Sequence, residues 1–181
     1  MTYQQQLRRI AAYQHGIITT TDADEVDVPA VALRKLAQRG TLRRIGHGVY
    51  RFDEFPRTVG SAEAEAIALV GEDAYLEGES VLALLNLGHA NPARIEIATR
   101  RQVRRNLPVW ITITRRTKLE ETETTAYHGV PSVILKKALQ QVKDRIPHSR
   151  WKEAVDQAAR RELLGPHEIQ ELLSHETDEV V

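Results

Sequence analysis

The chain has 181 residues, no cysteine, and 25 basic against 25 acidic side chains, which gives a formal net charge of zero. The lack of cysteine excludes disulfides, thiol catalysis and cysteine-bound zinc, and no stretch approaches the roughly 18 apolar residues of a membrane span. The N-terminus lacks the apolar segment of a signal peptide, so we expect a cytoplasmic protein without membrane association.

The zero net charge conceals blocks of one sign. Residues 29–51 contain six cations and no acid, residues 61–93 contain six acids and no cation, and residues 94–118 contain eight cations against Glu96 alone. Such blocks predict separate positive and negative surfaces. The alternative is that each block is an ordinary solvated face.

Three helices are predicted at the start of the chain. The first is capped by Thr2, has apolar residues at helical spacing and ends near Gly16. A short second helix covers residues 21–25, after threonines that can cap it. The third has Pro29 in its first turn, where the missing N–H costs nothing, and runs to Arg39.

The third helix is predicted to have two faces. Residues spaced i, i+3, i+4 and i+7 share one side of a helix. The residues predicted to face the core are Leu33, Leu36 and Ala37. The residues of the opposite face are Val31, Arg34, Lys35 and Gln38.

A basic hairpin is predicted to follow this helix. Its strands cover residues 42–45 and 49–52, and its turn is Gly46-His47-Gly48. Glycines on both sides of the tip suit the positive φ angles that hairpin turns require. Arg43 and Arg44 are adjacent, so both cannot face outward on a flat strand.

Three helices followed by a basic hairpin indicate a winged helix-turn-helix, in which the third helix enters the major groove of DNA and the wing approaches the phosphate backbone or the minor groove. Cations are needed where phosphates pass, and arginine, lysine or glutamine is needed to read bases. A protein-docking module remains an alternative, while RNA binding is disfavoured because Tyr50 and Phe52, which could stack on bases, look like core residues. The predicted DNA-binding residues are Arg34, Lys35, Gln38, Arg39, Arg43, Arg44 and His47.

A second domain is predicted after a link rich in proline and glycine, which divides the chain into domains 1–58 and 61–181. Its composition predicts an α+β fold, with a small sheet packed by helices. Expected strands cover residues 93–99 and 109–114, with a third strand and turn within 124–131. Expected helices cover residues 61–70, 80–87, 132–142, 149–164 and 165–174, with Ser61 and Ser132 as caps, and the tail 175–181 is expected to fray.

No catalytic, metal-binding or cofactor-binding motif is present in the sequence. The seven histidines lack metal-ligand spacing, and the nucleophile-elbow, Walker and dinucleotide-binding patterns are missing. Glu120 and Glu121 lie in a charged segment, where solvation explains them. Ser80 and His89 suggest a nucleophile and base, but each has an ordinary place at a helix end. We expect no enzyme activity, no metal and no cofactor.

Several motifs resemble the AbiEi family, the antitoxins of type IV toxin–antitoxin pairs. The N-terminal frame is Leu36, Gly40, Leu42 and Gly48-Val49-Tyr50. Three later segments are also similar to the family: DAYLEGESVLALLNLG, YHGVPSVILKKAL and AVDQAARRELLGPHEI. The chain departs from the family pattern at Asn86, where a histidine is expected, and at Lys136-Lys137, where arginine and threonine are expected.

The resemblance implies a repressor that binds inverted repeats in the double-stranded operator DNA of its own operon through the N-terminal domain. It also implies that the C-terminal domain counteracts a cognate nucleotidyltransferase-like toxin without requiring a stable complex. The alternatives are a stand-alone winged-helix transcriptional regulator with a ligand- or partner-sensing C-terminal domain, and a subunit of a nucleic-acid-processing enzyme. The enzyme subunit would need a catalytic constellation that the sequence does not show.

Overall fold

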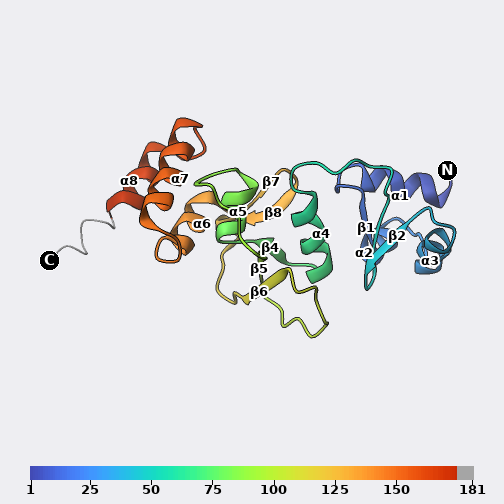
Figure 1. Ribbon diagram of the computed structural model, residues 1–181. Coiled ribbons are helices and arrows are strands. Elements are labelled where there is room, and N and C mark those ends of the chain that lie inside the picture. The colour runs from blue at the N-terminus through green and yellow to red at the C-terminus, as the bar shows by residue number, and fades with distance from the viewer. Residues whose placement is uncertain (175–181) are drawn as a thin grey trace. The chain divides into compact units, whose positions relative to one another are not determined.

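The computed structural model describes residues 1–174, so the expectation of a frayed tail lies outside the described residues. The chain divides into two compact units (Figure 1). The first comprises residues 1–72 with 128–130, and the second comprises residues 73–127 with the chain from 131 onward. Both units combine helices with a small sheet, which confirms the predicted α+β class.

The first unit contains the three predicted helices and the hairpin, but the first helix ends at Ala11 and not near Gly16, because residues 12–16 form turns. It also contains one strand that the sequence did not predict. That strand, β1, pairs antiparallel with β3, and the three-stranded sheet has the order β1-β3-β2. The elements are α1 (Tyr3–Ala11), β1 (Ile17–Thr19), α2 (Thr20–Glu25), α3 (Ala30–Gln38), β2 (Arg43–Gly46), β3 (Val49–Arg51) and α4 (Ser61–Val70).

Short polar side chains determine where the first two helices begin. The Thr2 side chain accepts a hydrogen bond from the Gln5 amide, and the Gln5 side chain accepts one from the Thr2 amide. Thr19 and Asp22 form the same reciprocal cap on α2. Each cap satisfies amide groups that a helix start leaves without partners. The prediction that Pro29 lies in the first turn of α3 is wrong: Pro29 is the residue before the helix, where its ψ of 141° is extended, and it provides no side-chain cap.

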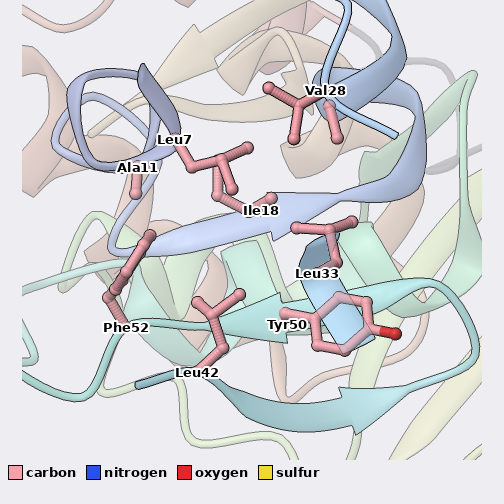
Figure 2. Packing of buried hydrophobic residues seen from close by; sticks show 9 residues of the cluster. Leu7, Ala11, Ile18, Val28, Leu33, Leu42, Tyr50 and Phe52 are labelled. Carbon is pink, nitrogen blue, oxygen red and sulfur yellow. The ribbon is translucent and has the colours of Figure 1, made fainter. Parts of the chain in front are cut away.

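The core of the first unit gathers side chains from all three helices and the sheet around Ile18 (Figure 2). Leu33 of α3 is fully buried in this cluster, so one side of α3 is fixed against the core. The other buried members are Leu7, Ala11, Ala23, Val28, Leu42, Tyr50 and Phe52. Tyr50 and Phe52 are therefore core residues, as expected.

The hairpin contains a β-bulge that explains its adjacent arginines. Arg44 lies opposite Tyr50, but Gly46 lies opposite Val49, so Ile45 is the extra residue. A bulge bends and twists the strand, and both Arg43 and Arg44 are exposed.

The two glycines of the turn have different roles, so the expectation that both supply positive φ is wrong for one of them. Gly48 has a φ of 69°, as expected. Gly46 has no positive φ; it allows close packing instead, because an added Cβ would lie 2.2 Å from Leu69 Cδ2 of α4. Helix α4 thus packs on the hairpin and belongs to the first compact unit. The proposed boundary near residue 60 remains a prediction about independent folding.

The second unit is built on a five-stranded sheet with the order β6-β5-β4-β8-β7. Strand β4 pairs antiparallel with β5 and parallel with β8, and β5 pairs parallel with β6. The strands are β4 (Ala74–Leu76), β5 (Ile95–Thr99), β6 (Ile111–Arg115), β7 (Thr124–Tyr127) and β8 (Val130–Val133). The helices are α5 (Glu79–Leu84), the 3-10 turn η1 (Glu121–Glu123), α6 (Leu135–Val142), α7 (His148–Arg160) and α8 (Pro166–Ser174).

Two predicted serine caps are wrong. Ser132 lies buried in β8 opposite Leu76, and α6 begins only after Ile134. Ser61 is the first residue of α4 rather than its cap, which is Gly60; the Ser61 hydroxyl accepts a hydrogen bond from the Thr58 amide. Serine offers the same local bonds in turns and strands, so its presence alone does not mark a helix start. Within residues 1–174, no helix combines the length and apolar character of a membrane span.

Candidate nucleic-acid interface

Helix α3 presents an exposed polar face opposite its buried side. Arg34, Lys35 and Gln38 are exposed, as is Arg39 directly after the helix. Val31 belongs to the same face and is 44% exposed. The structure therefore brings the four sequence-predicted residues of the helix to one accessible surface. Figure 2 shows Leu33 on the other side of α3, pointing into the core.

The polar side chains of this face have no partner in the part of the chain that the structure describes. None of Arg34, Lys35, Gln38 and Arg39 forms a side-chain hydrogen bond or ion pair with another residue among 1–174, although such pairs are common elsewhere in this unit. Three full positive charges and one amide therefore face solvent. This is the arrangement that a base-reading helix needs, because a donor already engaged within the protein would have to be released first.

The hairpin carries the other three predicted residues, and two of these are engaged within the protein. The Arg43 guanidinium binds the Asp53 carboxylate through Nε, 2.8 Å from Oδ2, and Nη2, 2.9 Å from Oδ1. Arg44 Nε donates to the Gly46 carbonyl oxygen at 3.2 Å, across the bulge. His47 is exposed at the tip. The sequence could not show the first contact, since it depends on how the chain after β3 folds back.

The sixth cation of the basic block, Arg51, is a core residue. It is 2% exposed and donates hydrogen bonds to the carbonyl oxygens of His15 and Phe55, the second at 2.8 Å. Its guanidinium also lies 3.6 Å from Asp53 and 3.9 Å from Glu65. Strand β3 is the central strand of its sheet and is buried along its whole length. Arg51 therefore stabilises the unit and is unavailable to a ligand.

Acidic residues after the hairpin pair with several cations of the first unit. Arg8 of α1 binds Glu54 with a 2.6 Å contact, and Arg57 binds Glu65 of α4 at 2.9 Å. The Arg43–Asp53 pair is a third such contact, whereas Arg34, Lys35 and Arg39 form no ion pair among residues 1–174.

The charge blocks of the second unit pair in part with one another. Acids of residues 61–93 bind arginines from later in the chain. The pairs are Asp73 with Arg101, Glu77 with Arg116 and Glu79 with Arg150, with contact distances of 2.9, 2.9 and 2.8 Å. The sequence shows the blocks but not their partners.

Ser80 and His89, considered above as a nucleophile and its base, form no hydrogen bond with each other in the part of the chain that the structure describes. The Ser80 hydroxyl accepts a hydrogen bond from the Glu96 amide at 2.9 Å, whereas His89 lies 3.2 Å from Glu153. Serine and histidine thus have separate structural partners. No group of three or more potential metal-ligating side chains occurs within residues 1–174.

Comparisons with known proteins add to this geometry. Residues 5–52 match the family model described as transcriptional regulator, AbiEi antitoxin. The matched segment runs from α1 through β3 and thus contains every predicted DNA-binding residue. The chain is also similar to the crystal structure of the RV2827C protein from Mycobacterium tuberculosis, with 16% identity, a TM-score of 0.46, and coverage of 96% of this chain and 72% of that chain. None of the curated proteins matches the chain.

Proposed function

We propose that the protein is the antitoxin of a type IV toxin–antitoxin pair and represses its own operon, because residues 5–52 match the family model of AbiEi antitoxin transcriptional regulators. It binds inverted repeats in the promoter through the first unit. The observation that carries the proposal is the exposed face of α3, whose cations have no intramolecular partner among residues 1–174.

In this proposal α3 lies in the major groove and reads base edges. Arginine and lysine donate to the two acceptors of guanine, and glutamine pairs with adenine. Arg34, Lys35 and Gln38 supply these groups from successive turns of one helix face. The buried Leu33 on the opposite side holds the helix against the core, so the reading side chains project from a fixed support.

The hairpin binds the DNA backbone in the same proposal. Arg44 and His47 are exposed beside the turn, and Arg43 is half-exposed although it is paired with Asp53. Phosphate contacts position a protein on the duplex and carry no sequence information of their own. The wing therefore contributes affinity for any duplex, and α3 contributes preference for the operator.

The second unit counteracts a nucleotidyltransferase-like toxin in this proposal and is not itself an enzyme. Support comes from the family match of the first unit and from the separate structural partners of Ser80 and His89. A toxin reading frame overlapping or directly downstream of the gene is the expected neighbour. Its absence would favour the stand-alone regulator with a sensing second domain.

The experiment separates the two roles in the full-length protein. A triple variant, Arg34→Ala with Lys35→Ala and Gln38→Ala, is expected to lose footprinting on DNA from upstream of its own gene and to release a promoter reporter. The same variant is expected to rescue cells from the cognate toxin as well as the wild type does. The matched control, Arg104→Ala, removes an exposed cation from the second unit and should leave the footprint intact. A triple variant that still protects the same DNA contradicts the proposal.

A further inference from the structure

The Arg43–Asp53 ion pair places a carboxylate where a DNA phosphate would bind. Nε of Arg43 lies 2.8 Å from Oδ2 and 3.1 Å from Oδ1 of Asp53, and Nη2 lies 2.9 Å from Oδ1. Two oxygens thus meet one edge of the guanidinium. A phosphate group uses the same edge with two of its own oxygens in the same bidentate manner. One arginine edge cannot hold both acceptors at once.

The Asp53 carboxylate is also held from its other side. Arg51 Nε lies 3.6 Å from Asp53 Oδ1, and Arg51 is itself fixed by the carbonyl oxygens of His15 and Phe55. The carboxylate therefore lies between a buried guanidinium and an exposed one. The hydrogen bonds from Arg43 lower the pKa of Asp53 below its ordinary value, so the carboxylate remains ionised at neutral pH.

The pair is open to a ligand from outside. The side chains of Arg43 and Asp53 are 51% and 56% exposed. An ion pair this exposed contributes little to stability, because both charges are well solvated when they separate. An exposed pair that matters little to the fold can exchange partners when a stronger acceptor approaches.

We propose that Asp53 competes with DNA phosphate for the Arg43 guanidinium. Arg43 then binds the DNA backbone by exchanging one bidentate acceptor, the Asp53 carboxylate, for another, the phosphate. This inference rests on the proposed DNA binding of the hairpin. Asp53 then acts as a positioning residue in the free protein, since it holds the Arg43 guanidinium through hydrogen bonds. It also lowers the affinity for every duplex regardless of sequence.

The test compares full-length Asp53→Asn with full-length Glu54→Gln. Glu54 is the neighbouring acid and binds Arg8 of α1 at 2.6 Å, so its replacement removes one negative charge without touching Arg43. Binding to the promoter duplex and to a scrambled duplex is measured across a sodium chloride series, in the wild-type and the Arg43→Ala background. Melting curves accompany each variant.

Asp53→Asn is expected to tighten binding on both duplexes by about two- to fivefold, the range that an exposed ion pair allows, and beyond any gain from Glu54→Gln. The slope of log K against log salt should become steeper. In the wild type, the Asp53 carboxylate takes up a cation when Arg43 leaves it for phosphate, and this uptake offsets part of the cation release, whereas the neutral amide of the variant takes up none. Both effects should vanish in the Arg43→Ala background, and the melting temperature should stay close to that of the wild type.

Four outcomes overturn the inference. A gain that Glu54→Gln matches, or that persists in the Arg43→Ala background, reflects overall charge alone. Weaker binding by Asp53→Asn means that Asp53 supports Arg43 on DNA and does not compete with it. If the wild type prefers the promoter duplex but Asp53→Asn changes nothing, the proposed function stands and the competition does not. Absence of any duplex binding by the wild type overturns both.

Discussion

Helix α3 and the β2–β3 hairpin are equally basic in sequence but differ in how their cations are used. The arginines and lysine of α3 are exposed and have no partner among residues 1–174, whereas all three arginines of the hairpin are engaged within the protein. One binds Asp53, one binds a carbonyl of its own strand and one is buried. A count of charges therefore does not measure the charge available to DNA.

The difference follows from the surroundings of each element. Residues 29–51 contain no acid, so the outward side of α3 has no carboxylate within its own segment. Strand β3 is the central strand of its sheet and leads directly into Asp53 and Glu54. The chain after β3 thus brings acids beside the hairpin arginines. This is why the helix is suited to reading bases and the hairpin to exchangeable backbone contacts.

The largest expected effect breaks the hairpin itself. Arg51→Ala removes hydrogen bonds to two carbonyl groups. It also removes one of the cations that lie near the half-buried Glu65 carboxylate. We expect the unfolding free energy to fall by about 3 kcal/mol, measured by denaturant melts. The control Arg39→Ala, at an exposed position after α3, should change it by less than about 0.5 kcal/mol. If the variant has normal stability but does not bind DNA, Arg51 contacts DNA, and the contrast between the hairpin arginines and the cations of α3 is wrong.

A smaller effect is expected from the reading face of α3. Arg34→Ala should weaken binding to the operator by about 1–3 kcal/mol and relax the preference at one base position. Binding to scrambled DNA should change much less, because that duplex offers no matched base. Titration of both duplexes checks this. An equal loss on the two would make Arg34 a phosphate contact, and α3 would then resemble the hairpin.

The smallest effect concerns Val31, the apolar member of the exposed face of α3. An apolar side chain at the start of a recognition helix suits contact with the methyl group of thymine. Val31→Ala should cost about 1 kcal/mol on the operator. The cost should disappear when one thymine in each half-site is replaced by deoxyuridine, which lacks that methyl group. If no thymine replacement removes it, Val31 does not contact a base.

Much of the first unit was predictable because its signals are local. The Thr2 cap and the two faces of α3 both depend on neighbours within a turn of helix. The features that the sequence did not predict depend on partners far along the chain. Strands β1 and β4 have three residues each, too short for an alternating pattern to stand out.

The candidate site was predictable only in part for the same reason. The sequence placed the residues predicted to read bases on one helix face, because helical periodicity alone determines that grouping. It did not reveal the contact between Arg43 and Asp53, the burial of Arg51 or the packing of Leu69 against Gly46. A local clue to Arg51 was its position between Tyr50 and Phe52, which are both buried. A cation between two core residues of a central strand is a candidate for burial.

The division of labour between α3 and the hairpin is tested most directly by the salt dependence of the double variant Arg43→Ala with Arg44→Ala. Each lost phosphate contact lowers the slope of log K against log salt by about 0.9. We expect the slope to flatten by roughly one to two units, with equal weakening on operator and scrambled duplexes, so that the ratio of the two affinities stays unchanged. An unchanged slope with a lowered melting temperature, or a loss confined to the operator, would contradict the account.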